Sequence, residues 1–410
     1  MKTFRDSRCQ RSGRKPCPSG ERGLSLVELM VAMVVGLLFV TALTKLFIDL
    51  SRANQEMAKT NGQIESARFA MQFLGNDIIH GGYWGGFVPE FDNLVLTGSP
   101  TDTPTLIPDP CLSFTTPWTE AYMDSLLGIP VQTYGNGQAI GTCGPGGADI
   151  IDSRLAGTDA MVVRHAETCT FPADANCAAD VAGALYFQPS NCEVEIADGF
   201  PYALGTSNFI RYQRDCDGAS GSTPPTFSSG TPALKRKFIQ TVYYIRDYAA
   251  APGDGIPTLV RSRLDSSDGV NPVHLAAEAL VPGIERFRVE LGIDNVSETG
   301  DPVDYTVALD WLIDDEWDTP TNRGDGIPDD FVHCDSASPC NAALLTNVVA
   351  VKLYVLARSA ESTPAYNDSK TYTMSSDGSV TVGPFSDSFK RHMYSSTFRL
   401  YNVSGRRETP

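Results

Sequence analysis

Near its N-terminus the chain reads Arg22-Gly23-Leu24-Ser25-Leu26-Val27-Glu28. An apolar stretch follows and extends to Ile48, interrupted only by small residues, two threonines and Lys45. A helix of about 20 residues spans the hydrocarbon core of a bilayer, so this stretch is long enough to cross one. The residues after Ile48 do not form the small-residue site at which an ordinary secretory signal is removed, so we expect the apolar helix to be retained.

Charge is unevenly distributed along the 410 residues. Residues 1–23 carry seven Lys and Arg against two acidic residues, a net charge of +5, so the rest of the chain carries −22 and the whole chain −17. A basic tail before an apolar helix stays in the cytoplasm, which predicts that the acidic body is exported. The acidic balance also excludes nucleic acid as the main partner, because such binding requires clustered cations.

Glu28 is the one acidic residue within the apolar stretch. A carboxylate inside a membrane is costly, which makes it a candidate functional residue. The alternative is structural, because Ser25 and Glu28 have the spacing of a capping box and an acidic side chain in the first turn suits the helix dipole. The spacing alone favours neither interpretation.

Residues 22–28 and the apolar run behind them resemble the class III signal of type IV pilins and pseudopilins. The resemblance implies that a membrane peptidase cleaves after Gly23 and methylates the new amine of Leu24. It also implies that Glu28 is needed for assembly, since its carboxylate can pair with the terminal ammonium of a neighbouring subunit in lipid-like surroundings. Leu24 stands where the family more often has Phe, and the leader is longer than in most major pilins. Both departures occur in minor pilins.

The helix is predicted to continue beyond the apolar stretch, to residue 80. Apolar and small residues recur at spacings of four and three, which places them on one helix face. They are Ala53, Met57, Thr60, Ile64, Ala67, Met71, Leu74 and Ile78. We expect this stripe to pack on the protein's own sheet or on other stems in a fibre, and the glycines from Gly81 onward to end the helix.

Ten cysteines are present, two of them in the basic tail. The other eight are Cys111, Cys143, Cys169, Cys177, Cys192, Cys216, Cys334 and Cys340. An even number of cysteines in an exported body predicts disulfides. Proximity in the sequence favours pairing each of the last six with its neighbour, which leaves Cys111 with Cys143, but the sequence does not fix this connectivity. Zinc is disfavoured because no pair has the close spacing of a structural zinc site.

The rest of the chain predicts β-structure, and hence an α+β fold: a long N-terminal helix, with its transmembrane half at about 24–48, packed on an antiparallel sheet. Residues 81–235 are rich in Gly, Pro, Ser and Thr and predict a loop-rich, disulfide-stapled β region. Its strands are expected at 160–165 and 184–188, and its exposed or disordered loop at 220–232.

Residues 236–405 contain clearer strand patterns and predict the antiparallel sheet itself, followed by a tail at 406–410. The strands are expected at 238–246, 284–293, 348–356 and 397–403. Five strings in this region are distinctive: Tyr243-Tyr244-Ile245-Arg246, Gly255-Ile256-Pro257-Thr258-Leu259-Val260-Arg261, Leu280-Val281-Pro282-Gly283-Ile284-Glu285, Val348-Val349-Ala350-Val351-Lys352-Leu353 and Phe398-Arg399-Leu400-Tyr401-Asn402.

In this order the five strings resemble the minor pilin family PilW. The resemblance implies a structural component of a type IV pilus rather than an enzyme, which primes pilus assembly near the tip. The implied partners are other minor pilins, the major pilin, the prepilin peptidase, the inner-membrane assembly platform and a tip adhesin. The implied location is the inner membrane, with the body in the periplasm, and afterwards the pilus fibre at the cell surface.

The region from Asp310 to Asp335 is strongly acidic. Clustered oxygens in an exported protein are a candidate calcium site. The residues concerned are Asp318, Asn322, Asp325, Asp329 and Asp330. Their spacing departs from a calcium loop, because Pro320 and Arg323 stand where a ligand and a glycine are required. We therefore favour a solvated acidic loop, and no cofactor, over a calcium site.

The sequence contains no familiar catalytic motif. Its five histidines are scattered, and it has neither a phosphate-binding glycine loop nor a His-Glu-x-x-His motif. Two alternatives to a minor pilin remain. One is a type II secretion pseudopilin, which shares the N-terminus. The other is a membrane-anchored periplasmic enzyme or calcium-dependent adhesin.

Overall fold

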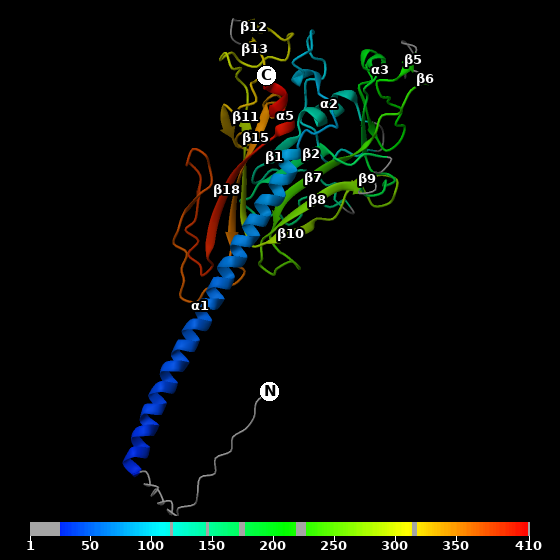
Figure 1. Cartoon of the computed structure of the whole chain (residues 1–410). Helices are drawn as coiled ribbons and strands as arrows, with labels where there is room; N and C mark the ends of the chain where they lie inside the picture. The colour runs from blue at the N-terminus through cyan, green and yellow to red at the C-terminus, as the bar shows by residue number, and fades with distance from the viewer. Residues whose placement is uncertain are drawn as a thin grey trace, which may run out of the picture. The chain divides into compact units, whose positions relative to one another are not determined.

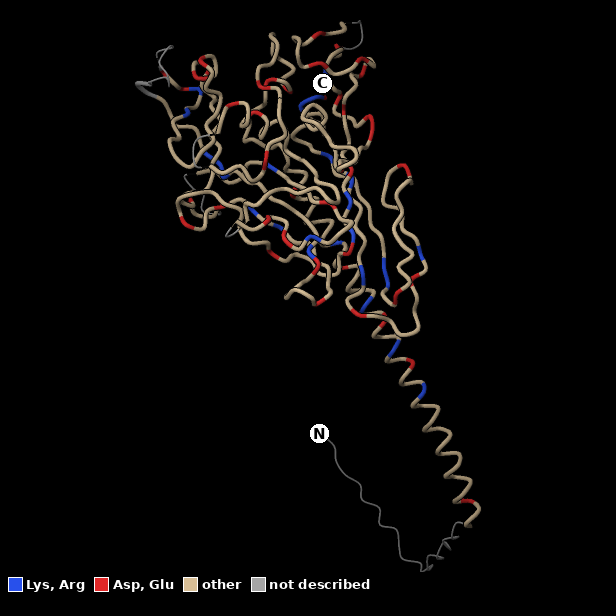
Figure 2. The backbone as a smooth tube through the Cα atoms, turned by 180° about the vertical axis from the view of Figure 1, so that it is seen from behind, with Lys and Arg blue, Asp and Glu red and all other residues tan. Residues whose placement is uncertain are grey.

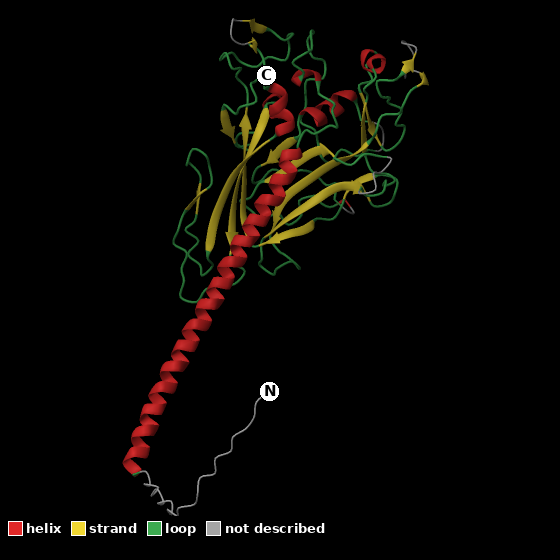
Figure 3. Cartoon of the chain, viewed as in Figure 1, coloured by secondary structure: helices red, strands yellow, loops and turns green. Residues whose placement is uncertain are grey.

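The computed structural model describes residues 25–114, 118–144, 147–171, 177–218, 227–313 and 318–408. These residues form one long helix, several short helices and two main antiparallel sheets (Figures 1 and 3). The chain divides into two compact units, Met1–Met57 and Ala58–Pro410. The predicted α+β class is confirmed.

The long helix α1 (Leu26–His80) contains 55 residues and contributes to both units. It ends as predicted, because the Gly81 N–H turns back to the carbonyl of Ile78 and Gly82 adopts a left-handed φ of +75°. The predicted stripe is buried in its second half, at Ala67, Leu74 and Ile78. The stripe residues of the first unit, Ala53 and Met57, are exposed.

The first sheet lies in the body and follows the order β1-β2-β7-β3-β4, with β8 beside β7 and both β9 and β10 beside β8. Its strands are β1 (Val131–Tyr134), β2 (Ala160–Ala166), β3 (Tyr186–Pro189), β4 (Tyr202–Gly205), β7 (Arg236–Arg246), β8 (Thr258–Ser266), β9 (Pro272–His274) and β10 (Glu278–Pro282). The second sheet follows the order β14-β11-β15-β18. Its strands are β11 (Ile284–Ile293), β14 (Asp330–Val332), β15 (Val348–Arg358) and β18 (Arg391–Arg399).

Small elements complete the body. The short strand pairs are β5 (Asp217–Gly218) with β6 (Phe227–Ser229), β12 (Trp311–Ile313) with β13 (Asp318–Pro320), and β16 (Tyr372–Thr373) with β17 (Thr381–Val382). The short helices are η1 (Glu90–Asp92), α2 (Glu120–Gly128), α3 (Glu193–Ala197), α4 (Ala342–Thr346) and α5 (Tyr401–Arg407). Of the loop expected at 220–232, residues 220–226 lie outside the described residues.

The expected division between residues 235 and 236 is not where the sheets divide. Strand β7 is buried on both faces over most of its length, and it pairs with β2, β3 and β8. A strand of this kind belongs in the middle of a sheet and recruits partners from both sides of the chain. The division falls instead at Gly283, whose left-handed φ of +85° turns the chain from β10 into β11.

The second half of α1 covers both sheets. Ala67, Ala70, Leu74 and Ile78 share one core with Met161 and Tyr243 of the first sheet and with Phe287 and Val289 of the second. Figure 1 shows this half of α1 lying where the two sheets meet, with β18 on one side and β8 and β10 on the other. Removing this apolar surface from water is the main term that holds the helix on the body.

The C-terminal segment differs from the prediction. The strand expected at 397–403 ends at Arg399, and α5 follows it and extends to Arg407, into the expected tail. The guanidinium of Arg407 is buried and lies 2.9 Å from Asp92 and 3.2 Å from Asp294. Although burial opposes the charged form, these carboxylates hold the pKa of Arg407 above its ordinary value. A buried cation requires such partners, so the ion pairs fix this end of the chain to the body.

Four disulfides staple the body, as the fold class predicted. They join Cys111 to Cys143, Cys169 to Cys177, Cys192 to Cys216, and Cys334 to Cys340. These are the pairs that proximity in the sequence favoured. Three of the four lie in the region 81–235, where loops outnumber strands and the local hydrophobic cores are small.

Candidate functional site

The first turn of α1 is closed by a reciprocal capping box. The Ser25 N–H donates to Glu28 Oε2 and the Glu28 N–H donates to Ser25 Oγ, both at 3.1 Å. Gly23 and Leu24 lie outside the described residues. Glu28 therefore caps its own helix, as the structural interpretation predicted. The capping box uses only Oε2 of the Glu28 carboxylate, so Oε1 can still accept a hydrogen bond from a cation.

The first half of α1 presents an apolar surface. All side chains from Leu26 to Leu50 are exposed, and α1 is the one helix among the described residues that is long and apolar enough to cross a membrane. Figure 2 shows few charges along this half. Its threonine hydroxyls donate back to helix carbonyls, Thr41 to Leu37 and Leu38 and Thr44 to Val40, so these hydroxyls do not require water.

The second half of α1 is attached to the body by a buried carboxylate. Asp77 lies 3.0 Å from His165 Nε2 on β2 and accepts a hydrogen bond of 2.9 Å from the Tyr243 hydroxyl on β7. Burial alone would lower the pKa of His165, but the hydrogen bond and charge of Asp77 raise it above its ordinary value. Burial also raises the pKa of Tyr243, so its hydroxyl stays a donor. The sequence analysis missed this contact, although an acid between Leu74 and Ile78 of a buried stripe was a visible signal.

A second polar contact fixes α1 to the other sheet. Gln63 is buried, and its Nε2 donates to the carbonyl oxygens of Ala357 at 2.5 Å and Lys390 at 3.2 Å. These carbonyls end β15 and precede β18. A backbone carbonyl can accept two hydrogen bonds, and the Lys390 carbonyl also accepts from the Ser359 N–H. Gln63 therefore sets the height of α1 on the second sheet.

In the described structure, the candidate calcium ligands of the acidic region have other partners or lie on separate strands. Asn322 donates to the Ala308 carbonyl, Asp325 accepts from the Ile327 N–H, and Asp329 accepts from the Asn295 and Val296 N–H groups. Asp318 and Asp330 lie on separate strands, β13 and β14. No group of three or more His, Cys, Asp or Glu placed to hold a metal occurs within the described residues. The polar side chains named here mainly stabilise loop backbone.

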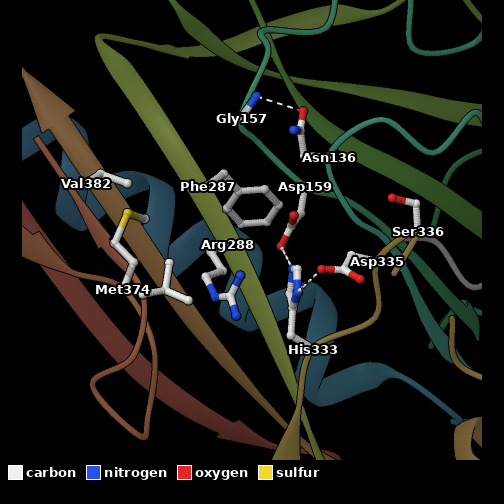
Figure 4. Close-up of a pocket in the computed structure, with 11 residues that line it drawn as sticks. Asn136, Gly157, Asp159, Phe287, Arg288, His333, Asp335, Ser336, Met374 and Val382 are labelled. Carbon is white, nitrogen blue, oxygen red and sulfur yellow. Dashed lines mark hydrogen bonds and ion pairs between the residues drawn. The ribbon is translucent and has the colours of Figure 1, made fainter. Parts of the chain in front are cut away.

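One cavity of roughly 270 Å³ opens between the sheets and the β16–β17 hairpin. His333 stands in its wall between two carboxylates, with Nε2 2.9 Å from Asp159 and Nδ1 3.5 Å from Asp335 (Figure 4). A hydrogen bond from the Ser338 N–H holds the pKa of Asp335 below its ordinary value. Both ring nitrogens of His333 therefore face carboxylates.

Residues 242–402 match the family model described as Type IV Pilus-assembly protein W, and residues 18–44 match the Prokaryotic N-terminal methylation motif. The C-terminal part of the body is thus similar to PilW, and the N-terminus carries a prepilin-type motif. The first match begins within β7 and ends in α5, so it includes the whole second sheet. No curated protein and no solved structure matches the chain.

These two matches identify a protein related to type IV pili. A prepilin signal implies processing by a peptidase, and a pilus-assembly family implies contact with pilus components. Both families describe assembly or N-terminal processing and neither describes an enzyme. The prepilin match and the exposed apolar half of α1 together fit a membrane-anchored pilin.

Proposed function

We propose that this PilW-like chain is a minor pilin. It is cleaved between Gly23 and Leu24, methylated at Leu24, and inserted with other minor pilins to prime a type IV pilus near its tip. The observation that carries the proposal is the combination of a prepilin signal with a PilW-like body on one continuous helix.

The orientation follows from charge. The tail of residues 1–23 has a net charge of +5 and the residues after it carry −22, within a total of −17. Basic segments are retained in the cytoplasm, which places the body in the periplasm. Four disulfides suit that compartment, because disulfides persist in oxidising surroundings.

Assembly would use both halves of α1. In the membrane, cleavage exposes an ammonium at Leu24, and Glu28 of an adjacent subunit can accept it through the oxygen that the capping box leaves open. The partners are other minor pilins and the major pilin, the inner-membrane assembly platform, and a tip adhesin. The mechanism is packing and ion pairing in a medium of low dielectric, where an unpaired charge is costly.

A type II secretion pseudopilin shares the signal and remains the nearest alternative, but the match over residues 242–402 favours a pilus. A membrane-anchored adhesin that requires calcium, or an enzyme, belongs to a different class. Deleting the gene separates the first two, because loss of pili supports our proposal and loss of secretion with intact pili contradicts it. Adhesion that disappears on calcium removal while pili stay intact would favour the third.

The first experiment is the N-terminal mass of the protein from membranes, with and without the prepilin peptidase. A chain that starts at N-methylated Leu24 only when the peptidase is present supports the proposal. A chain that keeps residues 1–23, or is cut near Ser51, rules it out.

The second experiment separates the two roles of Glu28. Glu28→Gln keeps the capping box, because Gln can occupy that position, but removes the charge. We expect this variant to be processed and to remain in the membrane without entering pili. The matched control, Ser25→Ala, breaks the box and keeps the carboxylate, and we expect it to assemble. The reverse pattern would make Glu28 a helix cap only.

A further inference from the structure

The cavity beside β11 has a polar floor on the face of the second sheet that points away from α1. Phe287 and Val289 point into the core shared with α1, so Arg288 between them points to the opposite face. Loops from the first sheet supply Asn136 and Asp159, and the β16–β17 hairpin covers the far side. Figure 4 shows the Arg288 guanidinium between the side chains of Met374 and His333.

The carboxylates around this cavity already have donors. Asp159 accepts from the Val289 N–H and from His333, each at 2.9 Å. Asp335 accepts from the Ala337 and Ser338 N–H groups. Glu290, next along the strand, accepts from the Tyr354 hydroxyl and the Ser376 N–H. Each of these carboxylates therefore has donors within the described part of the chain, and none of those donors is Arg288.

The donors are not occupied. Arg288 makes no hydrogen bond with a described residue; its nearest charge is Glu290, 3.6 Å from Nε, and Nε itself is buried without a partner. Asn136 accepts from the Gly157 N–H through Oδ1 at 2.8 Å, which leaves its amide nitrogen as a donor. A mostly buried guanidinium with unused N–H groups is unfavourable unless something supplies acceptors.

The remaining wall is apolar and the space is small. Met374 is buried, and Val380 and Val382 of the hairpin line the same side. A cavity of roughly 270 Å³ is at or below the lower end of small-molecule sites, about 300 Å³. It has room for a group the size of one side chain.

We propose that this cavity binds a carboxylate carried on a short apolar stem, with Arg288 and Asn136 donating to the oxygens and the hairpin enclosing the stem. A planar guanidinium matches a carboxylate through two parallel hydrogen bonds. The carboxylate can belong to a free small acid or to an acidic side chain of another polypeptide. The binding does not depend on the proposed role in the pilus.

The test uses the full-length protein in detergent, with its methionine methyl groups labelled for NMR. The chain has nine methionines, and Met374→Leu assigns the signal that reports on the cavity. We expect butyrate to shift the Met374 methyl saturably in the millimolar range, and butyramide, which has the same stem without the charge, to bind about tenfold more weakly. A capped glutamate, N-acetyl-glutamate amide, tests the side-chain source. Tighter binding of this probe than of butyrate identifies a polypeptide ligand, and the opposite result a free acid.

Variants complete the test. Arg288→Gln should weaken butyrate binding by about tenfold or more, while Arg263→Gln, which removes an exposed charge on β8, should leave it unchanged. Unshifted signals from the other methionines show that each variant is folded, and Arg288→Lys, which keeps the charge, gives an intermediate affinity. Equal binding of butyrate and butyramide, or unchanged binding by Arg288→Gln, overturns the proposal.

Discussion

Replacing Gly75 with alanine should loosen α1 from the body, although alanine is the better helix former. An alanine Cβ at this position would lie 2.2 Å from Cε1 and 2.7 Å from Cζ of Phe398 on β18, closer than packed atoms approach. Overpacking of this kind costs about 1–3 kcal/mol. The gain from replacing glycine in a helix is about 1 kcal/mol. We therefore expect a net loss of up to about 2 kcal/mol.

Gly62 provides the matched control on the same helix. Nothing lies within 4 Å of a Cβ built there, so Gly62→Ala should stabilise α1 by about 0.5–1 kcal/mol. The helix term is common to both variants, so the difference between them, about 1–3 kcal/mol, isolates the collision with Phe398. Combining Gly75→Ala with Phe398→Leu should recover part of the loss, since the two sites are in contact and their effects are not additive.

The measurement is hydrogen exchange of the α1 amides near residues 67–78 in the full-length protein in detergent. Exchange reports the free energy of local opening, which is the relevant quantity for one helix on a larger body. If Gly75→Ala protects these amides as well as Gly62→Ala does, then α1 does not approach β18 as closely as the structure shows.

Two further predictions concern charges. Asp77 raises the pKa of His165. The stabilising contribution of this pair is complete below the ordinary value of 6.5 and is lost as the pH rises through the raised value, so the protection of the α1 amides, after correction for intrinsic exchange, should fall with increasing pH. Asp77→Asn should remove that fall in protection. Arg407→Ala leaves the buried Asp294 without a cation and leaves Asp92 with Arg406 alone, and it should cost about 3–5 kcal/mol in thermal unfolding. Arg399→Ala, which breaks a more exposed pair with Glu408, should cost less than about 1 kcal/mol. If Arg407→Ala lowers the stability as little as Arg399→Ala does, then the ion pairs of Arg407 are not essential to the body.

The long helix was predictable because its signals are local. The apolar run, the capping pair at Ser25 and Glu28 and the terminal glycines act over a few residues each, and the structure confirms a helix that ends at His80. Strands with strong β-branched or alternating patterns were predictable for the same reason, such as β11 at its predicted bounds of residues 284–293. Local patterns do not say which strand pairs with which, so the presence of two sheets and their strand orders were not predicted.

The partners in the polar contacts of the body were not predictable, because they join residues far apart in the chain, although the place of Asp77 in the buried stripe was a visible signal. Asp77 and His165 are 88 positions apart, and Arg407 and Asp92 are 315 apart. In the sequence each of these residues reads as an ordinary surface charge or a scattered histidine. Only the fold shows that each charge is buried, and burial is what turns an ion pair from a weak surface contact into a strong constraint.

The family match covers only some of the residues that line the cavity. Arg288, His333 and Met374 lie within the residues that match the PilW model, whereas Asn136 and Asp159 lie outside them. The match therefore covers the guanidinium but not the donor opposite it or the carboxylate that orients His333. Since the proposed binding needs both walls, a PilW-like second sheet alone does not create the site. Any ligand specificity must arise from how residues 81–241 of this chain are docked against that sheet.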